Sequence, residues 1–184
     1  AYSVRCAPQV IGPARELSLY DPAPEDSPGA YTELQLPVES APARKAKLLA
    51  TTHWKESEME PMIVNLPAFK IIGMRYFGKN ENQEISDLWR DTNPRMGEIR
   101  QVTGRGAYGL CSNVEGAAPG EFEYVAGLEV SSAEEVPAGM VVRAVPASKY
   151  AVFAHVGSLE NLPATYQYIY QTWLPQSGNE LTGG

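Results

Sequence analysis

Between residues 61 and 77, the hydrophobic pattern predicts two strands that meet at a proline. The run PMIVNLPAFKIIGMRYF is rich in β-branched and aromatic residues, and Pro67 interrupts it. Because proline cannot donate a ladder hydrogen bond, we expect a bend or a break there. Residues 140–156 (MVVRAVPASKYAVFAHV) show the same pattern, with Pro146 between two strand-like runs. The chain is therefore predicted to contain two proline-interrupted strand pairs.

A helix is predicted after each strand pair. From about residue 83 to residue 101, apolar positions recur close to every 3.6 residues, which is typical of an amphipathic helix. Pro94 predicts a break or kink in this helix near Asn93. The second helix is predicted from about 161 to 173, stopped by the Pro and Gly residues at 175 and 178.

The strands that should accompany the two helices are distributed unevenly along the chain. Two strands, 107–114 and 122–130, are expected after the first helix, whereas none follows the second. At the other end of the chain, the runs 16–20 and 31–38 have a strand pattern around the turn-rich segment DPAPEDSPGA. A helix with an apolar stripe needs a sheet to cover. We therefore expect the N-terminal strands to complete the sheet beneath the second helix.

These patterns predict an α+β domain that contains a duplicated β-α-β-β unit and an antiparallel sheet. The length of 184 residues suits one domain. Its predicted parts are an N-terminal hairpin (13–39), a linker (40–60), a first repeat (61–131) and the start of a second repeat (139–184).

Composition and charge limit the partners of the chain. The net charge of −7 disfavours direct binding of nucleic acid, which needs clustered Lys and Arg to neutralise phosphates. No stretch approaches the ~18 uninterrupted apolar residues of a membrane span. The N-terminus lacks a basic segment followed by an apolar one. We expect a cytoplasmic protein that does not bind a membrane.

The metal-binding and reactive residue types are sparse. Cys6 and Cys111 are the chain's cysteines, they lie far apart, and their spacing does not suggest a metal site. For a cytoplasmic protein, we expect both thiols to be reduced. No phosphate-binding glycine motif and no metal cluster is evident, so we expect no cofactor and no metal.

Four segments resemble the GyrI-like domain family: LYDPAPEDSPGAYTELQLPV (19–38), EYVAGLEV (123–130), VPASKYAVFAHVG (145–157) and TYQYIYQTWLPQSGNEL (165–181). The family includes the effector-binding domains of BmrR- and Rob-type transcription regulators and some stand-alone integron-cassette proteins. The resemblance implies a duplicated unit in which an antiparallel sheet and two helices surround a central ligand cleft. It covers most of the chain except about the first dozen residues and 40–59.

The order of these segments differs from that of the family. In the family, the hairpin with the Tyr-Asp-Pro sequence follows the SGNEL segment, whereas here it comes first. A circular permutation that joins Gly184 to the neighbourhood of Gly12 would restore the order. The alternative is a homodimer that exchanges its N-terminal hairpins. The chain is thus expected to be a permuted monomer or a swapped homodimer.

The resemblance implies a small organic ligand that is flat, hydrophobic and often cationic, as in multidrug binding. Aromatic side chains stabilise such a ligand by stacking and cation–π contact. Ordinary core packing is the alternative for the aromatic residues on helices. The candidate wall residues are Tyr20, Trp89, Tyr108, Tyr124, Phe153, Tyr170 and Trp173.

At the position of the cleft acid, the sequence departs from the pattern of the family. In the family, an acidic residue stands two positions before the tyrosine of the Tyr-Asp-Pro sequence, and Ser18 occupies that position here. Positions 16, 18 and 20 share one face of a strand, so Glu16 is one candidate for the missing charge. Glu129 is the other candidate, and each of the two also fits a solvated surface position.

The leading hypothesis is an effector-binding, sensor or sequestering domain linked to transcription regulation. Some family members hydrolyse cyclopropane-bearing natural products with a cleft glutamate, so an enzyme that uses a cleft carboxylate as general base is one alternative. A protein-interaction module like the gyrase inhibitor of the family is another. Because Ser18 replaces the usual acid, we expect binding rather than catalysis and name no catalytic residue.

Overall fold

The computed structural model describes residues 16–20, 31–40, 60–156 and 161–182. The strands are β1 (Glu16–Tyr20), β2 (Tyr31–Ser40), β3 (Met62–Leu66), β4 (Phe69–Gly78), β5 (Val102–Ser112), β6 (Phe122–Val130), β7 (Val141–Val145), β8 (Ser148–Val156) and β9 (Asn179–Leu181). The helical segments are α1 (Glu84–Thr92), the 3-10 helix η2 (Asn93–Glu98), α2 (Leu162–Tyr168), the π-helical η4 (Ile169–Trp173) and α3 (Leu174–Ser177).

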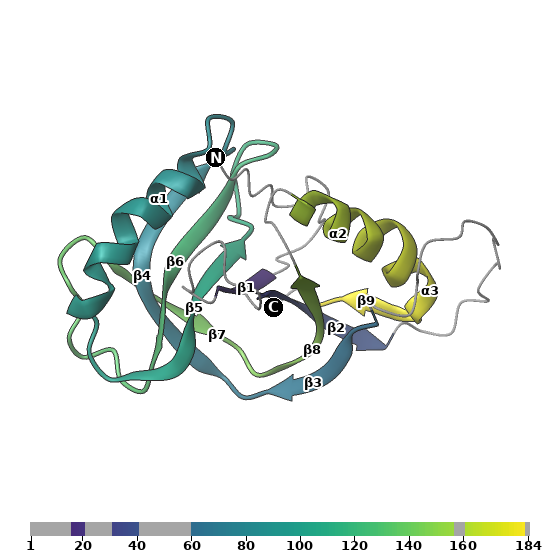
Figure 1. The fold of residues 1–184 in the computed structure, drawn as a ribbon, viewed down its shortest axis with the longest axis horizontal. Helices are drawn as coiled ribbons and strands as arrows, with labels where there is room; N and C mark the ends of the chain where they lie inside the picture. Colours follow the sequence, from purple (N-terminus) through teal and green to yellow (C-terminus); the bar gives the residue numbers. More distant parts are fainter. Residues whose placement is uncertain (1–15, 21–30, 41–59, 157–160, 183–184) are drawn as a thin grey trace.

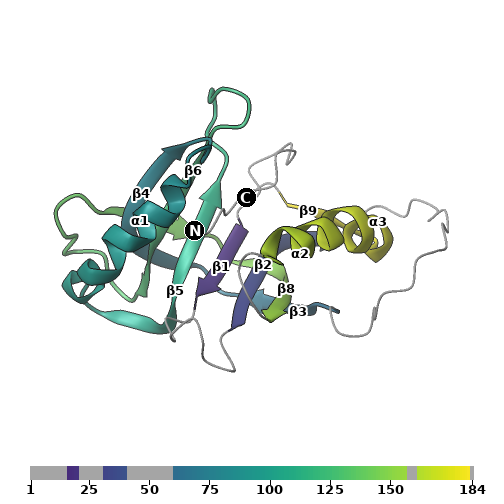
Figure 2. The same cartoon turned by 45° about the horizontal axis from the view of Figure 1, so that its top comes forward.

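In the described residues, the strands form an antiparallel sheet in the order β3-β8-β2-β1-β5-β6-β4-β7, and β9 pairs with β2. The helices α1 and α2 lie at different ends of the same face of this sheet (Figure 1), with β1 and β5 between them (Figure 2). The predicted α+β class, with two helices and antiparallel sheet, is confirmed.

The N-terminal hairpin pairs within the chain. Strand β2 pairs with β8, the strand that precedes α2, and β1 pairs with β5. The two N-terminal strands therefore join the two halves of the sheet at its centre. The duplication of the unit and the circular permutation remain predictions.

Pro67 and Pro146, which each separate two consecutive strands, lie where the sequence predicts a break. Strand β3 ends just before Pro67 and β7 ends just before Pro146. The predicted break near Asn93 is also confirmed, because α1 ends at Thr92 and η2 begins with Asn93. Strand β5 begins at Val102, five residues before its predicted start at Ala107, and its pairing with β6 is irregular between these two residues.

The second helical stretch is longer than predicted. It continues through η4 and α3 to Ser177 and ends at Gly178, whose φ of 68° suits a glycine. Pro175 does not stop it, since the proline lies in the first turn of α3, where a missing N–H is tolerated. None of the helices in the described ranges is long and apolar enough to span a bilayer.

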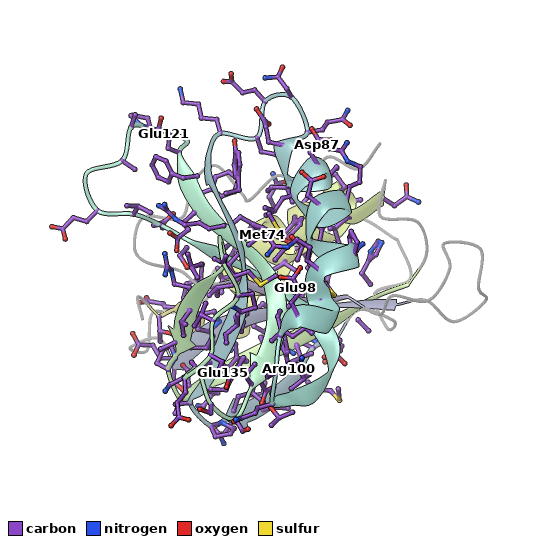
Figure 3. The ribbon with its side chains drawn as sticks, turned by 90° about the vertical axis from the view of Figure 1, so that its left-hand side faces the viewer. Met74, Asp87, Glu98, Arg100, Glu121 and Glu135 are labelled. Carbon is purple, nitrogen blue, oxygen red and sulfur yellow. The ribbon has the colours of Figure 1, made fainter. Side chains whose placement is uncertain are left out.

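Strand alternation gives the sheet two apolar faces, which we call the helix face and the opposite face. On the helix face, one cluster lies under α1 and another under α2. Met74 lies on the sheet behind α1, whereas Asp87 lies on the outer side of this helix (Figure 3). The opposite face has its own buried cluster, formed by Ile71, Leu110, Val125, Val145, Tyr150 and Val152.

Cys111 on β5 is disulfide-bonded. The prediction of a reduced thiol is therefore wrong for Cys111. The chain's other cysteine, Cys6, lies outside the described residues. The spacing of two cysteines along a sequence does not show whether they form a disulfide. That depends on whether the fold brings their Cβ atoms close enough for the two sulfur atoms to bond.

Candidate functional site

An aromatic pair covers the sheet on the α1 side of the helix face. Trp89 on α1 donates from Nε1 to Tyr124 Oη on β6 at 3.2 Å, and Tyr124 is only 3% exposed. The phenol of Tyr124 lies over Gly109 of β5, where an added Cβ would be 1.9 Å from its Oη. Gly109 therefore provides the room in which Tyr124 meets Trp89. A glycine inside a strand run often marks such a close approach, and this was the sequence feature that could have revealed the pair.

A second aromatic group lies on the α2 side of the same face. The ring of Phe153 on β8 meets that of Trp173 edge-on, with 5.0 Å between centroids and 85° between planes. Tyr166 and Tyr170 stack at 6.4 Å. Phe153 and Tyr166 are buried, whereas Tyr170 and Trp173 are half-buried and keep accessible surface. Tyr170 and Trp173 belong to the π-helical η4, and such wide turns inside helices are frequent at functional sites.

The three candidate residues of β1 occupy positions between the two aromatic groups. Glu16 pairs with Cys111, Ser18 with Gly109, and Tyr20 with Ala107. Directly opposed residues share a face of the sheet, so this register places positions 16, 18 and 20 on the helix face. The structure does not describe their side chains. Glu16 therefore remains the predicted acid of the cleft.

Tyr108 and Glu129 lie on the opposite face, away from Tyr124. Tyr108 pairs with Gly127, three positions from Tyr124 along β6, and residues an odd number of positions apart point to opposite faces. Tyr108 Oη donates to Glu129 Oε2 at 3.2 Å, and Thr103 Oγ1 donates to Glu129 Oε1 at 3.1 Å. Tyr108 and Glu129 thus lie on the opposite face, whereas the other eight predicted positions belong to the helix face: 16, 18 and 20 of β1 by register, and Trp89, Tyr124, Phe153, Tyr170 and Trp173 by their contacts. One cleft cannot contain both groups.

The hydroxyl of Tyr108 should ionise at a higher pH than that of an ordinary tyrosine, because its pKa is raised. Burial, followed by the carboxylates of Glu129 and Glu33, which disfavour a phenolate, together raise the pKa of Tyr108 to about 12. A tyrosine in the unfolded chain ionises at about pH 10. The stability that the folded chain gains from keeping Tyr108 neutral is therefore fully present below pH ~10 and is lost as the pH rises through about 12. In an alkaline titration of phenolate absorbance, the difference between wild type and Tyr108→Phe should therefore titrate near pH 12. A difference that titrates near 10 would contradict the buried, acid-flanked position.

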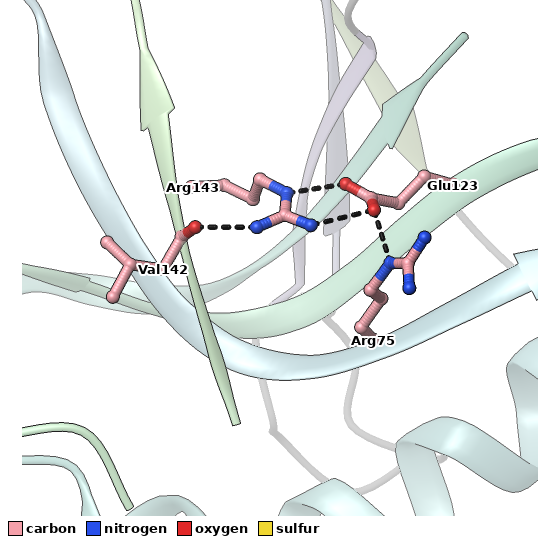
Figure 4. Close-up of polar contacts among 4 residues, drawn as sticks. All are labelled: Arg75, Glu123, Val142 and Arg143. Carbon is pink, nitrogen blue, oxygen red and sulfur yellow. Dashed lines mark hydrogen bonds and ion pairs between the residues drawn. The ribbon is translucent and has the colours of Figure 1, made fainter. Parts of the chain in front are cut away.

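Glu123, on the same strand and face as Glu129, is neutralised by two arginines (Figure 4). Arg143 donates to Glu123 from Nε at 2.5 Å and from Nη2 at 2.8 Å, and Arg75 donates to it from Nε. The hydrogen bonds from Arg143, followed by those from Arg75, lower the pKa of Glu123. Glu123 is thus committed to a structural ion-pair network.

The described residues do not provide a metal centre. No group of three or more His, Cys, Asp or Glu side chains in the described ranges is arranged to hold a metal ion.

The chain belongs to the GyrI-like small molecule binding domain family, whose sequence profile matches residues 59–184. This confirms the resemblance on which the ligand cleft was predicted. The chain is also similar to the transcriptional regulator BrlR of Pseudomonas aeruginosa, with 41% identity over 140 residues. The matched region is 75% of this chain and 51% of BrlR, so the chain spans about half the length of this curated relative.

Proposed function

We propose that this chain binds flat, hydrophobic organic cations in a cleft on the helix face, between α1 and α2. The observation that carries the proposal is the placement of two aromatic groups on one face of the sheet, on either side of β1. The Trp89–Tyr124 pair lies on the α1 side, and Phe153, Tyr170 and Trp173 lie on the α2 side.

The expected energetics agree with such a ligand. Aromatic contacts add about 0.5–1.5 kcal/mol each beyond the burial of area. A cation over an aromatic ring gains about 0.5–2 kcal/mol, depending on its desolvation. A carboxylate from β1 would add to the affinity for a cation, and Glu16 is our candidate for it. With Ser18 at the family's acidic position, this charge would come from one pleat further along the strand.

We further propose that binding serves transcription regulation, with this chain acting as an effector-binding or sensor domain in the cytoplasm. Support comes from the similarity to BrlR, a transcriptional regulator, over about half of that protein. A ligand that binds one conformation better than another can shift a regulator's equilibrium by its difference in affinity. In this proposal, ligand binding to this chain changes the conformational equilibrium of the regulator.

A matched ligand pair tests the proposed cleft. N-methylquinolinium and quinoline have similar shapes, but only the first carries a charge at neutral pH. We expect calorimetry to give a lower Kd for N-methylquinolinium, and a Trp173→Leu variant to bind it about tenfold more weakly. Phe77→Leu is the control, because Phe77 is 40% exposed and lies under Arg75 on the opposite face. Equal losses in both variants, or no binding by the wild type, would count against the proposal.

We also propose that the hairpin completes the sheet within one chain, as a circular permutation of the family's order. The pairings of β2 with β8 and of β1 with β5 support this arrangement. Light scattering on a size-exclusion column should then give a mass near 20.1 kDa across a wide range of concentrations. Twice that mass at the lowest concentration would favour the swapped homodimer instead.

A further inference from the structure

The opposite face carries an acidic group that the proposed cleft does not use. Glu33 on β2 and Tyr108 on β5 are both register partners of Leu19, so all three positions share this face. Glu129 accepts the hydrogen bond of the Tyr108 hydroxyl at 3.2 Å. The carboxylates of Glu33 and Glu129 both act on this phenol and raise its pKa. A cation placed beside Tyr108 would therefore experience the attraction of both charges.

Within the part of the chain that the structure describes, these two carboxylates have no ion-pair partner. Of the two glutamates on this face of β6, Glu123 is held by two arginines, as described above. No Lys or Arg among the described residues forms an ion pair with Glu33 or Glu129. The hydrogen bonds of Glu129 come from neutral hydroxyls, which leave its charge uncompensated.

A buried amide supplies independent evidence for a ligand. Gln35 is 6% exposed, and its Nε2 donates to Glu33 Oε2 at 3.2 Å, which places the amide at the edge of the acidic group. Its Oε1 is buried and accepts no hydrogen bond. A buried acceptor without a donor is costly, so native proteins usually satisfy it, with a ligand or with water. Gln35 Oε1 therefore lacks a hydrogen-bond donor.

An apolar surface lies next to Tyr108, the hydrogen-bond donor of Glu129. The rings of Phe69 and Tyr108 are 5.4 Å apart at a tilt of 46°. Phe69 also lines a hollow of about 280 Å³ with Ala68, Lys70, Ala144, Val145 and Pro146. Since ordinary ligand pockets begin near ~300 Å³, this hollow suits a single ring rather than a large drug.

We propose that the opposite face binds a small aromatic ligand with a protonated, N–H-bearing group such as an amidinium. Glu33, Glu129 and Gln35 Oε1 would accept its hydrogen bonds, and Phe69 and Tyr108 would contact its ring. All three polar partners are acceptors, so the site selects donors. This site is separate from the helix-face cleft and does not depend on it.

Benzamidinium tests this site, with benzyltrimethylammonium as a cation that has no N–H donor and benzyl alcohol as a neutral compound. We expect benzamidinium to bind the full chain more tightly than either. Glu129→Gln and Glu33→Gln should each raise its Kd about tenfold, because each removes a charged acceptor. Glu135→Gln, which removes an exposed carboxylate of equal charge (Figure 3), should leave the Kd unchanged.

Amide chemical-shift mapping locates the binding without any substitution. Benzamidinium should shift the signals of residues 33–35, 108 and 129, including the side-chain amide of Gln35. Trp173→Leu should weaken N-methylquinolinium but not benzamidinium, which separates a failure of this proposal from a failure of the helix-face cleft. The proposal is overturned if benzamidinium does not bind, binds no better than benzyltrimethylammonium, or shifts other residues instead.

Discussion

Replacing Gly73 by alanine should lower the free energy of unfolding by about 3 kcal/mol, the upper range for overpacking of a rigid core. Gly73 on β4 faces Gly127 on β6. A Cβ at Gly73 would lie 2.0 Å from the carbonyl oxygen of Ala126 and 2.6 Å from Gly127 Cα. Both are backbone atoms of a paired strand, so they cannot move aside without disrupting the ladder between β4 and β6.

Urea denaturation of Gly73→Ala and of a matched glycine variant measures this cost. Gly97 lies in η2, and a Cβ there meets no atom within 4 Å. Gly97→Ala should therefore be neutral or slightly stabilising, since alanine loses less conformational entropy on folding. Similar urea midpoints for Gly73→Ala and Gly97→Ala would show that β4 and β6 do not approach each other as closely as the structure describes.

Gly109→Ala should cost about 2 kcal/mol of stability, because the new methyl group competes with Tyr124 for one place. The predicted Cβ lies 1.9 Å from Tyr124 Oη and 2.6 Å from its Cζ. Tyr124 is buried and accepts the hydrogen bond of Trp89, so its ring cannot turn outward freely. The same substitution should weaken binding of N-methylquinolinium, since the displaced ring belongs to the proposed cleft.

A double-mutant cycle isolates this contact. In a Tyr124→Leu background, Gly109→Ala should cost at least about 1 kcal/mol less than in the wild type, because the competing ring is gone. Chemical denaturation of the four proteins gives the coupling energy. Equal costs of Gly109→Ala in both backgrounds would mean that Tyr124 does not cover Gly109.

The local elements of this fold follow closely from its sequence pattern. Pro67 and Pro146 mark the ends of strands, and Pro94 marks the end of α1, because proline acts on the backbone of its immediate neighbours. Pro175 shows the limit of this argument. Its effect depends on whether it lies inside a helix or at the first turn of a new segment, which the sequence alone does not distinguish.

The face on which a side chain lies was harder to predict. Tyr108 and Tyr124 both fit a cleft wall by composition, yet they lie on opposite faces of the sheet. Alternation within one strand is predictable, but relating two strands requires their register, and shifting a register by one residue reverses every side chain. The irregularity between Val102 and Ala107 makes β5 especially difficult in this respect.

The face of the sheet was equally hard to predict for the candidate acid Glu129. Glu129 was a candidate for the cleft, but it accepts from Tyr108 on the opposite face. The sequence does not distinguish Gln35 from other strand residues, because a glutamine in a strand belongs to no motif, and its buried, unpartnered Oε1 becomes evident only from the fold. The pairing of Trp89 with Tyr124 was likewise hidden, since the residues are 35 positions apart.

Intermolecular nuclear Overhauser effects with N-methylquinolinium would show whether the ligand lies on the helix face, because they identify the protein protons next to it. We expect contacts from the quinolinium ring to the indoles of Trp89 and Trp173 and to the ring of Tyr124. Contacts confined to Phe69 and Tyr108 on the opposite face, or none to either aromatic group of the helix face, would contradict it.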